Sequence, residues 1–200
     1  CVNLDGVMSI PSNVTSIEDS AFKGTSVSKI VFKDGTSPLT IGYSAFYNCK
    51  NLSSVEFPAR IKSIGNNAFG GDSSLSNITF KDGDSSLTIG SYVFSDASFK
   101  KLILPKNTES IGYGAFNNNV ELTSIILNEG IKTIGDGAFK GCNNLSGTLN
   151  IPSSVEDIGD RSFFGTAITK LVIKDGNKAL KIGNWAFQDC KVLTSFSLSN

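Results

Sequence analysis

The sequence predicts a β-dominated solenoid, a single repeat array over residues 1–200 in which about eight coils of 22–25 residues stack on one another. Three observations predict it: an Ile-Gly motif that recurs with this period, a phenylalanine five residues after each of these isoleucines, and an alternating apolar segment after each phenylalanine. A unit of this length cannot bury its own apolar side chains, so each coil must pack against its neighbours.

The isoleucine and phenylalanine positions are the most regular part of the period. The isoleucines are Ile17, Ile41, Ile64, Ile89, Ile111, Ile134, Ile158 and Ile182, at steps of 24, 23, 25, 22, 23, 24 and 24 residues. The phenylalanines are Phe22, Phe46, Phe69, Phe94, Phe116, Phe139, Phe163 and Phe187. In a stack of coils these phenylalanines would form one internal ladder, in which burial of each ring contributes about 1.5–3 kcal/mol.

Glycine follows the isoleucine in every copy except the first, where Glu18 stands instead. Glycine at such a position indicates either a positive φ or a close approach between two backbones. Because Glu18 is accepted in one coil, we expect glycine to be preferred there but not required.

The segment after each phenylalanine alternates apolar and polar residues and predicts a short β-strand. Strands from successive coils would pair in parallel at a spacing of about 4.8 Å. If Ile125 and Leu127 point inward, Ser124 and Ile126 point outward. Two kinds of turn follow these strands: one carries proline, as at Pro58 and Pro105, and the other carries Lys-Asp-Gly, as at residues 81–83.

Composition excludes several classes of function. Lys+Arg and Asp+Glu are equal at 18 each, so no net field would attract nucleic acid or an anionic membrane. The chain has no histidine, which removes the commonest general base and metal ligand. No phosphate-binding glycine motif and no recurring pair of carboxylates is present. We therefore expect no catalytic residue, no cofactor and no metal, and no segment that inserts into a membrane.

Four cysteines occupy one repeat position, three residues after the phenylalanine or its equivalent: Cys1, Cys49, Cys142 and Cys190. Disulfides or a metal site are the functional alternatives. Cys142 and Cys190 would lie two strand spacings apart, about 10 Å, whereas a disulfide needs Cα atoms within about 7 Å. Small buried side chains at a turn are the favoured interpretation. The repeat position also explains Cys1 without a lipid anchor.

The two ends predict a fragment of a longer array. Residues 1–11 align without gaps on residues 142–152, so the chain begins within a coil, and it ends on a predicted strand. Neither end has the polar character of a capping repeat.

The complete repeat resembles the BspA-like, or Treponema-type, leucine-rich repeat. Residues 142–159 and 184–190 are its clearest copies, and the resemblance covers essentially the whole chain. It implies a right-handed leucine-rich-repeat solenoid with one parallel sheet on the concave face. Short extended segments and single helical turns around Ala-Phe would form the convex side. Family members are typically secreted or surface proteins of gut and oral bacteria, and several are described as adhesins for host matrix proteins. An extracellular or cell-surface location is therefore implied.

The exposed side of the predicted sheet is the candidate partner-binding face. Its candidate residues are Val31, Glu56, Thr79, Lys101, Ile103, Ile126, Lys170 and Val172. Ile103 and Ile126 are adjacent in one outward column beside Lys101, and such a cluster of exposed aliphatic side chains suits a partner patch. The alternative is that β-branched residues simply favour strands.

An aromatic column forms a second candidate for partner contact. Tyr92, Arg161 and Trp185 each precede the alanine position, with Tyr43 and Tyr113 beside them. They could anchor a partner, but packing on a neighbouring loop is the favoured interpretation because each coil supplies only one.

Three functions remain open. The first is a non-catalytic module for protein binding or adhesion, with a host matrix or surface protein as partner and a monomer as the favoured state. The second is a structural spacer or stalk that displays another domain, which the mostly small and uncharged face would suit. The third is a targeting module attached to a secreted enzyme.

Overall fold

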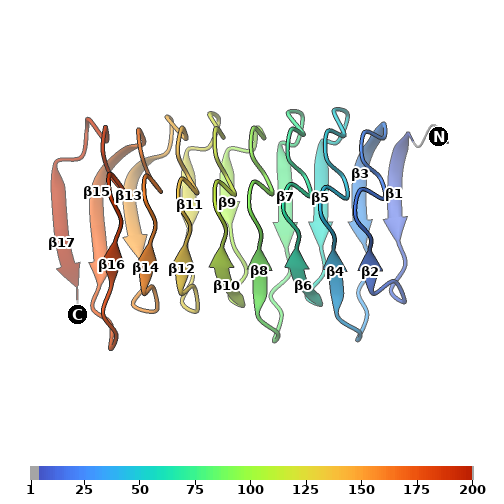
Figure 1. Ribbon diagram of the computed structural model, residues 1–200, viewed down its shortest axis with the longest axis horizontal. Helices are drawn as coiled ribbons and strands as arrows, with labels where there is room; N and C mark the ends of the chain where they lie inside the picture. The colour runs from blue at the N-terminus through green and yellow to red at the C-terminus, as the bar shows by residue number, and fades with distance from the viewer. Residues whose placement is uncertain (1–4, 200) are drawn as a thin grey trace.

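The computed structural model describes residues 5–199, and all secondary structure in this range is β-strand and turn. The coils lie side by side in chain order along the long axis of the molecule, from the N-terminal end to the C-terminal end (Figure 1). Odd-numbered strands form one side of the solenoid, here called the front, which faces away from the viewer in Figure 1; even-numbered strands form the other side, the back, which faces the viewer. The predicted solenoid is confirmed.

The front strands come from the alternating apolar segments. They are β1 (Gly6–Ile10), β3 (Val27–Phe32), β5 (Ser54–Phe57), β7 (Asn77–Phe80), β9 (Lys101–Ile103), β11 (Ser124–Ile126), β13 (Ser146–Ile151), β15 (Ala167–Lys174) and β17 (Ser195–Ser199). All their pairings are parallel, as predicted. The front is interrupted twice, however, and forms sheets of four strands (β1-β3-β5-β7), two strands (β9-β11) and three strands (β13-β15-β17).

The back strands end at the period isoleucines. They are β2 (Ser16–Ile17), β4 (Leu39–Ile41), β6 (Ile61–Ile64), β8 (Leu87–Ile89), β10 (Thr108–Ile111), β12 (Thr133–Ile134), β14 (Asp157–Ile158) and β16 (Lys181–Ile182). We expected short extended segments on this side. They are strands of two to four residues that pair into one continuous parallel sheet of eight, in which isoleucine lies opposite isoleucine from coil to coil.

The phenylalanine ladder is continuous through all eight coils. Successive rings are stacked with centroids 5.1–5.5 Å apart and planes within 15° of parallel. The six inner rings have no exposed surface. A shorter ladder of Phe32, Phe57 and Phe80 runs along the front strands and meets the first ladder edge to face. The interior is therefore one shared apolar column, as the period predicts.

The Ile-Gly glycines mark a close approach between backbones. A Cβ on Gly65 would lie 2.7 Å from the carbonyl carbon of Gly42 in the preceding coil, well inside the closest contact a Cβ makes. The glycines of this column do not have a positive φ. Glu18 belongs to the first coil that the structure describes, where no described coil lies on the side that a Cβ would meet.

The Ala-Phe segments are tight turns, not single helical turns. They are closed by hydrogen bonds between residues three apart, such as Tyr47 N–H to Ser44 O at 3.0 Å. Two positions in each turn are left-handed in all eight coils: the residue before the alanine position, such as Trp185 (φ 56°), and the second residue after the phenylalanine, such as Asn118 (φ 58°). The second position holds only glycine, asparagine or aspartate, the residues that adopt this conformation most readily.

The buried phenylalanine ladder predicts a loss of stability when one of its rings is removed. Phe116→Ala should lower the free energy of unfolding by about 3–5 kcal/mol, because it leaves a cavity between two stacked rings. Phe116→Leu should cost less, because more of the volume stays filled. Urea unfolding followed by circular dichroism measures both, with Val120→Ala, at a side chain 47% exposed in the same coil, as the control. A Phe116→Ala midpoint equal to that of the control would contradict a shared core column.

Candidate functional site

The front face brings the predicted residues into the outward columns expected of them. Ile103 pairs with Ile126, Val31 with Glu56, and Glu56 with Thr79. The two interruptions of the front divide the predicted set into three groups. Val31, Glu56 and Thr79 belong to the first sheet, Lys101, Ile103 and Ile126 to the second, and Lys170 and Val172 to the third.

Ile103 and Ile126 form an exposed aliphatic patch on this face. Their side chains lie on directly paired residues and are 50% and 45% exposed. Val31 and Val172 are partly buried and belong to other sheets, so they do not extend the patch. The adjacency predicted for Ile103 and Ile126 is therefore present, and Lys101 begins the same strand as Ile103.

A hollow of about 560 Å³ lies where the front sheet is interrupted between β7 and β9. We call it the β7–β9 groove. Its apolar lining is Ile78, Phe80, Ile103, Leu104, Pro105 and Ile126. Its polar lining is Asn77, Thr79, Asp82, Lys101, Lys106 and Asn128. Four of the eight predicted residues thus line one groove: Thr79, Lys101, Ile103 and Ile126.

The interruption falls where the longest coil meets the shortest. β7 belongs to the 25-residue step between Ile64 and Ile89, and β9 to the 22-residue step between Ile89 and Ile111. The front phenylalanine ladder also ends here, because Leu104 takes the place after Phe80. Ile78 and Phe80 point inward but are only partly buried, unlike Val55 and Phe57 at the same positions of the preceding coil. The groove therefore reaches the edge of the core.

The front face carries a surplus of positive charge. Its outward columns hold three lysines, Lys29, Lys101 and Lys170, and one carboxylate, Glu56. Glu56 is already ion-paired with Lys29. Within residues 5–199, neither Lys101 nor Lys170 takes part in an ion pair. The Lys101 ammonium at the groove is therefore available to a negatively charged group.

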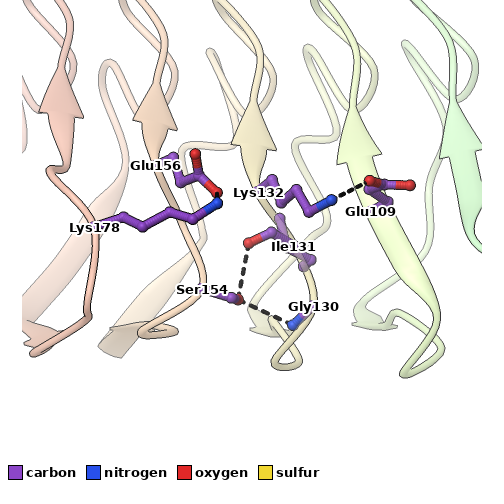
Figure 2. Close-up of polar contacts among 7 residues, drawn as sticks. All are labelled: Glu109, Gly130, Ile131, Lys132, Ser154, Glu156 and Lys178. Carbon is purple, nitrogen blue, oxygen red and sulfur yellow. Dashed lines mark hydrogen bonds and ion pairs between the residues drawn. The ribbon is translucent and has the colours of Figure 1, made fainter.

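The back carries charged side chains that are largely paired with one another. Lys132 Nζ lies 2.5 Å from Glu109, and Lys178 Nζ lies 2.5 Å from Glu156, in each case on neighbouring coils (Figure 2). The hydrogen bond from Lys132 lowers the pKa of Glu109, and the same bond raises the pKa of Lys132. Exposed pairs of this kind contribute little to stability, because water and salt screen them.

The serine beside these pairs has a structural role. Ser154 Oγ donates to Ile131 O at 2.9 Å and accepts from Gly130 N–H at 3.0 Å, which joins two coils (Figure 2). A nucleophilic serine needs a base within hydrogen-bond reach, and these two backbone groups supply none. We therefore interpret the contacts drawn in Figure 2 as links between coils.

The cysteine position is a column of buried hydrogen-bond donors. Cys49, Cys142 and Cys190 are free and buried, as predicted, and Cys1 lies outside the described residues. Each thiol donates to the carbonyl oxygen of the phenylalanine one coil earlier, at 3.2–3.3 Å. Asn119 occupies the same position and donates from Nδ2 to Phe94 O at 2.8 Å. Burial raises the pKa of the Cys142 thiol to about 12, so it stays protonated and unreactive.

Asp72 occupies this column in the coil after Cys49 and was not anticipated from the sequence. It has no exposed surface. Oδ1 accepts the Cys49 N–H at 2.7 Å, and Oδ2 has no partner. Burial raises the pKa of this carboxyl to about 8. The carboxyl is therefore mostly protonated at neutral pH.

The exposed aromatic side chains contact their neighbours along the array. The Arg161 guanidinium lies 4.4 Å from the centre of the Trp185 ring, and Tyr92 packs edge to face on Tyr113 with centroids 5.0 Å apart. Tyr43, Tyr113 and Trp185 remain about half exposed. The favoured interpretation, packing on a neighbouring loop, describes these contacts.

Within residues 5–199, no three His, Cys, Asp or Glu side chains gather in a way that could hold a metal ion. The same range has no helix with the length and hydropathy needed to cross a bilayer.

Comparison with known proteins places this solenoid in the class of leucine-rich-repeat proteins. The profile of the BspA-type leucine-rich repeat region matches six copies, over residues 1–122 and 109–200. The chain therefore belongs to the BspA-type leucine-rich-repeat family. No curated protein sequence matches it.

Solved bacterial structures share the fold. A leucine-rich cell-surface protein from Faecalibacterium prausnitzii A2-165 is 25% identical, with a TM-score of 0.65; the match covers 98% of this chain and 48% of that one. The T. pallidum leucine-rich-repeat protein is 25% identical, with a TM-score of 0.66, and the match covers 95% of this chain and 84% of that one. A leucine-rich-repeat protein from Bacteroides ovatus ATCC 8483 is also 25% identical, with a TM-score of 0.64, over 97% and 63% of the two chains. The chain thus spans about half the length of the first of these.

Asp72 predicts a pH dependence of stability. Its pKa is raised on folding from 3.8 to about 8, so the folded chain holds a proton that the unfolded chain releases between these values. Its contribution is fully present below about pH 4 and is lost as the pH rises toward 8. Asp72→Asn should remove this loss, because Asn119 shows that the column accepts an amide.

Urea unfolding at pH 5 and pH 8 measures the effect. The free energy of unfolding of Asp72→Asn minus that of the unsubstituted chain should increase from pH 5 to pH 8 by an amount on the order of 3 kcal/mol. Asp96→Asn, at an exposed turn two residues after Phe94, is the control and should show no such change. An equal pH dependence for all three chains would contradict a buried, protonated Asp72.

Proposed function

We propose that this chain is a non-catalytic protein-binding module of a secreted or cell-surface protein, and that it binds its partner through the front face. The observation that carries the proposal is the exposed pair Ile103 and Ile126 on neighbouring strands, at a groove that reaches the core. Exposed aliphatic side chains around a concave apolar site are typical of interaction surfaces.

The distribution of charge supports the front over the back. On the back, Glu109, Lys132, Glu156 and Lys178 neutralise one another across adjacent coils, which leaves little to offer a partner. On the front, Lys101 stands beside the aliphatic patch without an ion pair in the described range, next to the apolar lining of the groove.

Family membership supports the location and the class of partner. One structural neighbour is described as a leucine-rich cell-surface protein, and the match covers 98% of this chain and 48% of that protein. We therefore place the module outside the cell and expect its partners among host matrix or surface proteins. Adhesion is the proposed use of that binding.

The double variant Ile103→Asp with Ile126→Asp tests the proposal. Purified residues 1–200 are applied to an immobilised panel of extracellular-matrix proteins, and binding is followed by biolayer interferometry. We expect at least one panel member to bind and the double variant to bind it at least about 10-fold more weakly, because two carboxylates would enter an apolar contact.

Val192→Asp is the matched control, since Val192 is 47% exposed and lies outside the front strands. Circular dichroism confirms that each variant is folded. Binding that the double variant leaves unchanged would contradict the front face as the site. No binding to any panel member would favour a spacer that displays another domain.

A further inference from the structure

We propose that the β7–β9 groove receives an extended segment of the partner protein that presents one apolar side chain next to a carboxylate. This inference rests on the proposed function and specifies the chemistry of the partner at the centre of the front face. Three features of the groove carry it: its floor, its length and its single available cation.

The floor of the groove consists of core side chains that the protein itself leaves partly uncovered. Ile78 and Phe80 belong to the inward columns of the front strands and are partly buried, as are Ile125 and Leu127, whereas Val55, Phe57, Leu102 and Leu104 in the adjacent coils are fully buried. Phe80 stacks on Phe57 with centroids 4.6 Å apart, but the coil on its other side supplies Leu104 instead of a ring. An apolar side chain from a partner would cover this remaining apolar surface.

The length of the groove suits a short extended segment. It spans the coils of β7, β9 and β11, which is two strand spacings, or about 10 Å. About three residues of extended chain cover this distance. The neighbouring front strands β5 and β7 are joined by a parallel ladder, whereas β7 and β9 are not, so the groove lies over an interruption of the sheet.

The cation of the groove selects the charge of the segment. Asp82 is already engaged: Oδ1 accepts the Lys106 N–H at 2.9 Å, and Oδ2 lies 3.8 Å from Lys106 Nζ. Lys101 is the groove lysine without an ion pair among residues 5–199. A carboxylate beside the apolar side chain would pair with Lys101, and a second lysine there would be repelled.

Short capped peptides test the inference by NMR titration of the ¹⁵N-labelled chain. The probe is acetyl-Ser-Leu-Asp-Ser-amide. Its two controls replace Asp by Asn, which removes the charge, and Leu by Ala, which removes most of the apolar surface. We expect the probe to shift the amide signals of Thr79, Lys101, Ile103 and Ile126. The Asn control should bind about 2- to 5-fold more weakly, the range for one exposed ion pair, and the Ala control about 3- to 10-fold more weakly, because it loses one partly buried aliphatic group.

A matched pair of variants assigns the charge preference to one lysine. Lys101→Gln should abolish the preference for the Asp probe over the Asn probe. Lys170→Gln, in the same outward column on β15, should leave that preference intact. Both residues are exposed, and an otherwise unchanged spectrum shows that each variant is folded.

Three results would overturn the inference. One is a set of probe-induced shifts outside the groove, or none up to 10 mM peptide. Another is a charge preference that survives Lys101→Gln. The third is equal binding of free 4-methylpentanoate, which would make the groove a site for a small aliphatic acid. If a matrix protein still binds in an Ile103- and Ile126-dependent manner, the proposed function stands although the peptide inference fails.

Discussion

The distance between neighbouring coils is the constraint on which this structure depends. The eight-stranded back sheet sets it, because parallel strands joined by hydrogen bonds lie about 4.8 Å apart. Phenylalanine rings stack at 5.1–5.5 Å, close to that spacing. Glycine after the isoleucine is the other response to it, since a Cβ at Gly65 would lie 2.7 Å from the backbone of the preceding coil. The phenylalanine ladder, the back sheet and the glycine column thus all fit the same spacing between neighbouring coils.

The front face is where this constraint is relaxed. Its strands form three separate sheets, whereas the back sheet is continuous through eight strands and holds the coils in register. One interruption lies between β7 and β9, where coils of 25 and 22 residues meet, and the β7–β9 groove lies over it. The front, whose sheet is interrupted, is therefore the side on which surface features differ from coil to coil.

The parts of the fold that repeat could be predicted from the sequence. The phenylalanine ladder, the front strands and the adjacency of Ile103 and Ile126 all follow from residues at fixed offsets. The back sheet was expected only as extended segments, because strands of two residues such as β12 show no alternation and exist through pairing. The left-handed turn position could have been predicted, since all eight coils place Gly, Asn or Asp there.

The parts that occur once could not be predicted. Asp72 shares its column with cysteines, and only the packed turn shows that its carboxyl is buried. Arg60 is almost completely buried and donates to the carbonyl oxygens of Pro11, Val14, Lys33 and Ser37, which come from two earlier coils. The groove depends on how the coils of β7 and β9, which differ in length, pack against each other. The repeat pattern predicts only the features that the coils share, and these residues differ from it.

The pairing of a long coil with a short one has a consequence for how such arrays diversify. Unequal recombination between repeats adds or deletes whole coils, and the ring stack and back sheet tolerate this because every junction is built alike. The groove belongs to no single coil but to the junction between two. Gain or loss of one unit next to Ile89 would replace this junction by a different one. The shape of the front face can therefore change through the order of the units, without substitution of any core residue.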